Sequence, residues 1–145
     1  MRLTTRARYG VRLMVDLARH YGQGYIFLSD IARRQGISEK YLGNIVSVLK
    51  ASGMVSACRG VHGGYSRAKQ PAKISLKDIV RVLEKQSHLT GCVQKRSSCP
   101  RSNFCEVRRI WLQVEKYFYL SLASVSLQDV KRKCRVKPAI NLKER

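Results

Sequence analysis

A short helix, a tight turn and a longer helix are predicted within residues 29–53, and a glycine-rich hairpin follows directly. The short helix, DIARRQ, starts after Ser29 as its cap and ends at Gly36, a residue that readily takes the positive φ of a turn. Ser38 then caps the longer helix EKYLGNIVSVLKAS, which ends at Gly53. These are the proportions of a helix-turn-helix unit, so this stretch constrains the fold more than any other.

The hairpin after this unit has the character of a wing. Residues 54–59 and 65–68 are predicted as two short strands. The turn between them contains three glycines: Gly60, Gly63 and Gly64. A basic hairpin that follows a helix-turn-helix is typical of a wing, and glycines there permit close approach to a nucleic-acid backbone. Arg59 and His62 are therefore expected in or beside a minor groove.

The longer helix is predicted to read DNA. The side chains on the face away from its apolar stripe are Glu39, Lys40, Tyr41, Gly43, Asn44 and Ser47. Asparagine can pair bidentately with adenine, lysine can reach guanine or phosphate, and a capped helix N-terminus suits a phosphate. The residues predicted to bind DNA are Ser38, Lys40, Tyr41, Asn44, Arg59, Gly60, His62, Gly63 and Gly64.

Charge and composition agree with a nucleic-acid partner. The chain has 145 residues, 44% of them hydrophobic, and a net charge of +20, which favours binding to polyanions. No stretch approaches the apolar length of a membrane span, and residues 1–12 lack the apolar region of a secretory signal, so we expect a cytoplasmic protein that does not enter membranes. No phosphate loop or nucleophile elbow is present, so an enzyme is not expected.

The remaining pattern predicts a mainly α fold with a small β-hairpin wing: a winged helix-turn-helix head followed by a long C-terminal helix. A first helix over 5–21 and a β-like run at 25–28 precede the unit above. Two capping boxes are expected, Ser75 with Asp78 and Ser126 with Asp129. The long helix spans about 105–123, and its apolar stripe is Val107, Ile110, Trp111, Val114, Tyr117, Phe118 and Leu122.

Three cysteines lie close together in a polar, proline-containing segment: Cys92, Cys99 and Cys105. Thiols on one loop can reach a common point, and neighbouring Lys95, Arg96 and Arg101 would favour their thiolate forms. The Cys-x6-Cys-x5-Cys spacing is looser than a ferredoxin run. From the residues alone, a redox-active metal centre and a set of spare thiols both remain open. Cys58 is expected to be half-buried in the wing, and Cys134 lies in a basic tail.

The order of these motifs resembles the Rrf-type winged-helix regulators, a family that includes IscR, NsrR, RirA and CymR. The resemblance rests on MRLTTRARYGVRLMVDLA, LSDIARRQGISEKYL, VSACRGVHGGYSRAK, ISLKDIVRVLE and the three spaced cysteines. It implies a homodimer joined by the long helix, a winged head on a double-stranded DNA operator, and an iron–sulfur cluster on Cys92, Cys99 and Cys105. The implied division is 1–86 for the DNA-binding domain, 87–105 for the cluster loop, 106–133 for the dimerisation and terminal helices, and 134–145 for the tail.

The usual fourth cluster ligands of the family are absent. Arg108 stands where IscR-like members carry histidine, and Arg8 stands where NsrR-like members carry aspartate. Glu106, next to Cys105, is then the nearest oxygen donor, although a residue of the partner subunit or a small exogenous ligand is equally open. By analogy with IscR, a [2Fe–2S] cluster is expected ahead of [4Fe–4S]. The alternatives are a metal-free CymR-like regulator that acts through thiols or a partner protein, and a basic protein that binds nucleic acid without sequence preference.

Overall fold

A computed structural model describes residues 3–84 and 88–132 of the chain. The helices are α1 (Thr5–Arg19), α2 (Leu28–Gln35), α3 (Glu39–Ala51), α4 (Leu76–Leu83), α5 (Gly91–Gln94), α6 (Glu106–Ala123) and α7 (Leu127–Lys131). Two strands, β1 (Val55–Cys58) and β2 (Gly64–Arg67), and two 3-10 turns, η1 (Pro71–Lys73) and η2 (Arg96–Ser98), complete the order. The expected tail at 134–145, with Cys134, lies outside the described residues.

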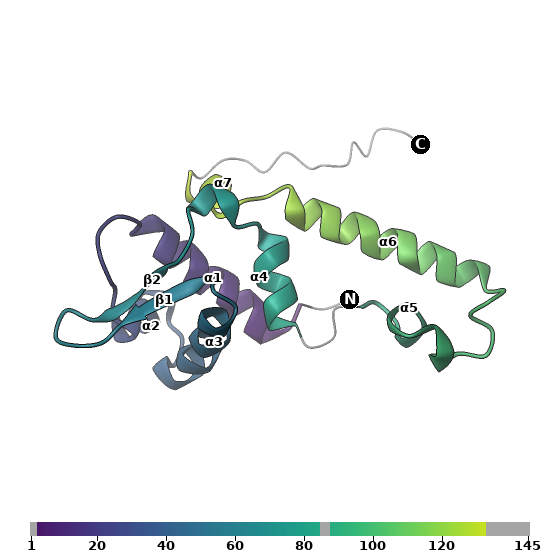
Figure 1. Cartoon of the computed structure of the whole chain (residues 1–145), viewed down its shortest axis with the longest axis horizontal. Coiled ribbons are helices and arrows are strands. Elements are labelled where there is room, and N and C mark those ends of the chain that lie inside the picture. The colour runs from purple at the N-terminus through teal and green to yellow at the C-terminus, as the bar shows by residue number, and fades with distance from the viewer. Residues whose placement is uncertain (1–2, 85–87, 133–145) are drawn as a thin grey trace.

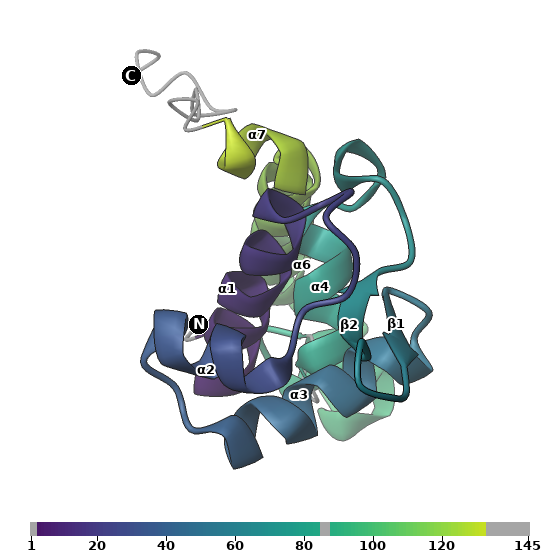
Figure 2. The same cartoon turned by 90° about the vertical axis from the view of Figure 1, so that its left-hand side faces the viewer.

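One hydrophobic core holds the head together. Apolar residues three and four apart place their side chains on one face of each helix, and these faces meet between α1, α3 and α4. The side chains that are almost fully shielded from solvent include Leu13, Met14, Ile31, Leu42, Ile45, Leu49, Ile79 and Leu83. Figure 2 shows α1 and α4 next to each other, with α2 and α3 across one end of them.

The helix-turn-helix begins two residues earlier than expected. Phe27 is the N-cap of α2 because its carbonyl accepts from the main-chain N–H groups of Asp30 and Ile31. Ser29 therefore lies inside the first turn, and its predicted role as the cap is wrong. Gly36 ends α2 in the left-handed conformation at φ 61°, and the Ser38 hydroxyl accepts from the Tyr41 N–H at 3.3 Å, so these two predictions are confirmed.

The wing is a two-stranded antiparallel hairpin in which Ser56 pairs with Ser66 and Cys58 with Gly64. The β-like run at residues 25–28 is reduced to one bridge, between Ile26 and Tyr65. Leu28 already belongs to α2, which leaves too few residues for a strand. The bridge fastens the segment before α2 to strand β2 of the wing.

The end of α6 returns to the head. Both capping boxes are present, and α7 packs on α1, with Leu127 fully buried in the same core as the head residues. The Leu127 N–H donates to the Ile74 carbonyl at 2.9 Å, which ties α7 to the residues before α4. The rest of α6 extends away from the head (Figure 1). Among the described residues, no helix combines the length and apolarity needed to span a bilayer.

Candidate nucleic-acid interface and cysteine segment

The N-terminal half of α3 presents an exposed polar face. Ser38, Lys40, Tyr41 and Asn44 are all exposed, while the opposite side of the helix packs into the core. A groove of about 510 Å³ runs along this face, and it is lined by Arg6, Tyr41, Asn44, Ile45 and Ser47. The groove adds Arg6 of α1 to the residues expected from the sequence, because α1 packs directly on α3.

The polar face of α3 is braced by aromatic and basic side chains of α1. Tyr41 meets Tyr9 edge to face, with ring centroids 5.9 Å apart. The Arg12 guanidinium lies 5.6 Å from the Tyr9 ring centroid, and its Nε donates to Gln35 Oε1 at 3.1 Å. These contacts fix the position of Tyr41 relative to α1, so the face is preorganised by the head itself.

The tip of the wing is exposed, but its glycines differ in role. Arg59, Gly60 and His62 are exposed, whereas Gly63 is buried. A Cβ on Gly63 would lie 2.5 Å from the Cys58 carbonyl oxygen, and one on Gly64 would lie 2.5 Å from that of Ile26. Gly63 is therefore required by the turn of the hairpin, and Gly64 by the close approach of the Ile26 backbone. Cys58, expected to be half-buried, is exposed at the last position of β1.

A buried carboxylate that the sequence analysis did not single out joins α1 to α2. The Asp16 side chain is 3% exposed and accepts two hydrogen bonds from Arg34, at 2.6 and 3.1 Å, and one from Gln35 Nε2 at 2.8 Å. Burial raises the pKa of Asp16, but the hydrogen bonds from Arg34 and Gln35 and the Arg34 charge outweigh it and lower the pKa below 3.8. Asp16 therefore holds α2 in place as an ionised carboxylate.

The three cysteines lie in a segment that runs beside the first half of α6, at the end of the molecule away from the wing (Figure 1). Cys92 belongs to α5, Cys99 follows η2, and Cys105 is the residue before α6. All three are half-buried free thiols. Arg108 of α6 donates from Nε to the Cys92 carbonyl at 2.8 Å, and the Thr90 hydroxyl lies 3.2 Å from Cys92 Sγ.

The contacts of this segment are mostly polar. Glu115 of α6 accepts from the Leu89 N–H at 2.8 Å and contacts His88 Nδ1 at 2.9 Å. The Ser102 hydroxyl bonds to the carbonyls of Arg96 and Cys99, and Val93 is the one buried apolar side chain of α5. Within the described residues, no three side chains of histidine, cysteine, aspartate or glutamate are arranged to hold a metal ion. Glu106 is exposed at the start of α6.

The long helix leaves its apolar stripe uncovered. Of its side chains only Tyr119 is buried, and it faces α4, where the Arg81 guanidinium lies 5.0 Å from its ring centroid. The exposed apolar residues of α6 are Val107, Ile110, Trp111, Leu112, Val114, Tyr117 and Leu120. Val107, Ile110, Val114 and Tyr117 recur every three or four residues, which places them on one face.

These features define a class of protein: a winged helix-turn-helix head with an exposed polar α3, a basic wing and a long helix behind it. The Rrf2 family model, described as that of an iron-dependent transcriptional regulator, matches residues 3–133. The chain belongs to this family. It is therefore a transcription regulator and not an enzyme, as the sequence predicted, and its winged-helix fold is confirmed by the solved structures below.

Similar proteins cover nearly the whole chain. Protein rrf2 of Nitratidesulfovibrio vulgaris is 38% identical over 138 residues, which are 95% of this chain and 92% of that protein. The solved structure of T. potens IscR has 36% identity and a TM-score of 0.75, and covers 92% of this chain and 88% of its own. The structure of CymR, described as the global cysteine regulator of B. subtilis, has 30% identity and a TM-score of 0.76, with 93% and 99% coverage.

Proposed function

We propose that this regulator is a cytoplasmic homodimer that binds a double-stranded DNA operator through α3 and the wing. The observation that carries the proposal is the exposed polar face of α3, a helix that packs on the wing strand β1, in a chain of net charge +20. The wing and α3 lie at the same end of the head (Figures 1 and 2). One duplex can therefore meet α3 in its major groove and Arg59 and His62 in or beside the adjacent minor groove.

Within this interface the side chains have separate roles. Asn44 and Lys40 read base edges, and the Ser38-capped start of α3 faces a phosphate. Tyr41 and Gly60 contact the sugar–phosphate backbone, and Arg6 joins them from the far side of the groove. Gly63 and Gly64 act by shaping the hairpin that carries Arg59 and His62.

The test is the selection of genomic fragments by the full-length protein, followed by affinity measurements on the selected and a scrambled duplex at fixed salt. Asn44→Ala should lower the preference for the selected duplex by about 10- to 100-fold, which is the usual contribution of one bidentate base contact. Lys50→Ala, at the exposed C-terminal end of α3, is the matched control and should leave the preference unchanged. Equal affinity of the wild type for both duplexes, with steep salt dependence, would favour the non-specific alternative instead.

The dimer is proposed from the uncovered stripe of α6. Apolar surface of this extent, arranged along one face of a helix, is typical of an interface between chains. A second copy of α6 offers the same self-complementary face, and pairing along it would place two heads on two half-sites of one operator.

We further propose that Cys92, Cys99 and Cys105 bind an iron–sulfur cluster, with [2Fe–2S] expected ahead of [4Fe–4S] and Glu106 as the candidate fourth ligand. The donor set fits, since three free thiols with basic neighbours Lys95 and Arg96 suit the thiolate ligation of iron. When bound, the cluster supplies an iron- and redox-dependent centre. Because the described side chains are not gathered, binding requires the segment to rearrange. The segment makes few buried apolar contacts and is held mainly by polar contacts, so this rearrangement costs little free energy.

A rearranged segment can act on the head through α6. Arg108 and Glu115 hold Cys92 and Leu89, and α6 packs on α4 in the head. A change in the contacts of these two side chains would shift α6 against α4 and, through it, the pose of α3. Iron, oxidant or nitric oxide at the cysteines is the proposed signal.

Anaerobic purification with measurement of iron and sulfide tests this part. Wild-type protein should contain stoichiometric iron and sulfide, and Cys92→Ser should lose most of both. Cys58→Ser, an exposed wing thiol outside the segment, is the matched control and should retain both. A wild type without iron that still binds its operator would support the metal-free alternative, which the likeness to CymR favours.

A further inference from the structure

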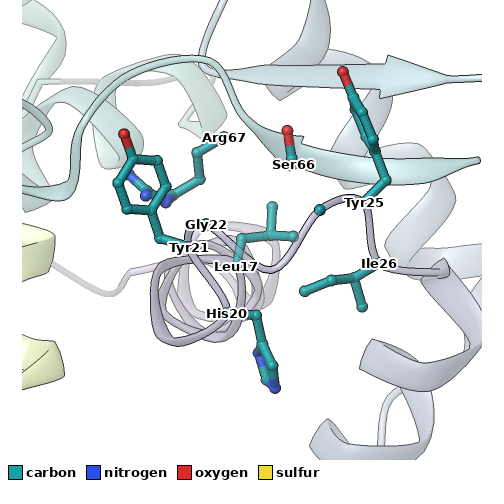
Figure 3. A pocket seen from close by; sticks show the side chains of 9 residues that line it. Leu17, His20, Tyr21, Gly22, Tyr25, Ile26, Ser66 and Arg67 are labelled. Atoms are coloured by element: carbon teal, nitrogen blue, oxygen red, sulfur yellow. The ribbon is translucent and has the colours of Figure 1, made fainter.

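A pocket of about 200 Å³ lies at the base of the wing, far from the cysteine segment. It opens between the end of α1, the residues that lead to α2, and strand β2 (Figure 3). Its apolar walls are Leu17, Tyr25 and Ile26, and Arg67 lies at one end beside Tyr21. The polar side chains His20 and Ser66 also line it. None of these residues belongs to the proposed DNA-contacting set.

Arg67 is buried without a counterion. The residue is 6% exposed, and among the described residues no carboxylate forms an ion pair with it. Its Nη1 donates to the Lys69 carbonyl, and its guanidinium carbon lies 4.2 Å from the centroid of the Tyr21 ring. Burial lowers the pKa of Arg67, yet a guanidinium stays protonated at any ordinary pH. Within the part of the chain that the structure describes, the buried charge of Arg67 therefore has no counterion.

The unpaired side of this guanidinium has a specific shape. Nε and Nη2 of Arg67 are both buried and have no hydrogen-bond partner within the described structure. These two N–H groups lie side by side in the guanidinium plane and form the edge that binds a carboxylate bidentately. Leaving such donors unpaired in a protein interior is unfavourable, so most buried arginines pair this edge.

We propose that this pocket binds a small organic carboxylate, whose two oxygens accept from Nε and Nη2 of Arg67. The apolar body of the ligand would lie against Leu17 and Ile26, and the volume, about seven times that of a water molecule in the liquid, suits a small organic acid. Because Nε and Nη2 have almost no exposed surface, binding requires the half-exposed Tyr21 side chain, or that of Arg67, to move. A carboxylate is favoured over phosphate because three of the walls are apolar.

Occupancy would join two parts of the head. Arg67 is the last residue of β2, and Tyr21 follows α1, so a ligand between them braces the wing against α1. The wing is otherwise fastened there by the Ile26–Tyr65 bridge. The effect on operator affinity rests on the proposed DNA-binding function, whereas the binding of the acid does not and is measured without DNA.

The experiment follows the arginine Nε–H resonances of the full-length protein by nuclear magnetic resonance during addition of acetate, succinate and benzoate. At about 10 mM, well above a weak millimolar Kd, at least one acid should shift the Arg67 Nε–H signal and raise the melting temperature. Benzamide, which has nearly the size of benzoate but no charge, should do neither. If none of the three acids shifts the Arg67 signal or raises the melting temperature, the proposal is overturned. It is also overturned if inorganic phosphate alone produces these changes.

Two variants locate the response. Arg67→Lys keeps the positive charge but lacks the two-pronged edge, and it should weaken binding of the responding acid by about tenfold or more. Arg33→Lys makes the same change on an exposed side chain and should leave binding unchanged; equal losses in both would overturn the site. Should Arg67→Lys fail to fold, Tyr21→Leu keeps Arg67 and removes its cover, and the Arg67 signal should then respond at a lower acid concentration. A response unchanged in Tyr21→Leu would place the acid elsewhere.

Discussion

The head and the long helix both carry apolar side chains, but they differ in how far a single chain buries them. Helix α1 buries seven of its fifteen residues against α3, α4 and α7, whereas α6, with eighteen residues, buries only Tyr119. Both helices carry apolar stripes of similar extent. The head therefore completes its core within one chain, and α6 does not.

The energetic difference between the two regions is large. Moving one large aliphatic side chain from water into a packed interior is worth about 1.5–3 kcal/mol. Val107, Ile110 and Val114 are each about half exposed, so in a single chain they forgo about half of that gain. A helix that keeps such a stripe uncovered is stable in this form only through the head at one end and the polar segment at the other. This exposed stripe is the reason that a partner for α6 is proposed.

The largest expected effect comes from placing charge on that stripe. Ile110→Asp with Val114→Asp should raise the dimer dissociation constant by at least about 100-fold, because two apolar side chains lose their burial and two carboxylates would be desolvated. Analytical ultracentrifugation over a range of concentrations measures it. The head should still unfold at nearly the wild-type temperature, since neither side chain contributes to its core.

Arg109→Glu supplies the control for this variant, since Arg109 is exposed on α6 but lies off the stripe. Its dimer dissociation constant should stay within a few-fold of the wild type. A wild type that is monomeric at all concentrations would break the comparison, because the stripe would then need another partner.

The second effect is expected in the head, where a buried carboxylate fixes α2. Removal of one partner of a buried ion pair costs about 3–5 kcal/mol, and because Arg34 is 35% exposed we expect about 2 kcal/mol for Asp16→Asn. Urea unfolding at neutral pH measures this loss. Asp30→Asn breaks an exposed pair with Arg33 and should cost less than about 0.5 kcal/mol.

The same carboxylate predicts a dependence on pH. Because the pKa of Asp16 is lower in the folded chain than its ordinary 3.8, its stabilising contribution is complete above that value. It is lost as the pH falls from about 4 through the folded pKa. The gap in stability between wild type and Asp16→Asn should therefore narrow below pH 4, and a constant gap would contradict the role given to Asp16.

Local signals explain which parts of this structure the sequence could predict. Gly36, the caps at Ser38, Ser75 and Ser126, and the glycine-rich wing act within a few residues of themselves, so their spacing predicts their structure. Ser29 failed as a cap because the carbonyl of Phe27, two residues earlier, already accepts the first helical bonds. The residues around Ser29 do not indicate whether Phe27 or Ser29 is the cap of this helix.

Long-range contacts explain most of what the sequence could not predict. Asp16 and Arg34 are eighteen residues apart, and nothing in their spacing distinguishes them from surface charges. In the sequence, Arg67 is indistinguishable from the other basic residues of the wing. Only the fold shows that Tyr21 lies over it. For the cysteines, the sequence brought three thiols into one segment, but their gathering around iron remains a prediction.

The smallest effect concerns the point where the two regions meet. Ser126→Ala removes the hydroxyl that accepts from the Asp129 N–H at 3.2 Å and should cost about 1 kcal/mol, the usual contribution of such a cap. Since α7 packs on α1 and buries Leu127 in the core, the loss should appear in the unfolding of the head and leave dimer dissociation unchanged. Ser75→Ala, which breaks the matching box of α4, should give a similar loss in the same transition. If Ser126→Ala weakened the dimer instead, α7 would belong with α6 and not with the head.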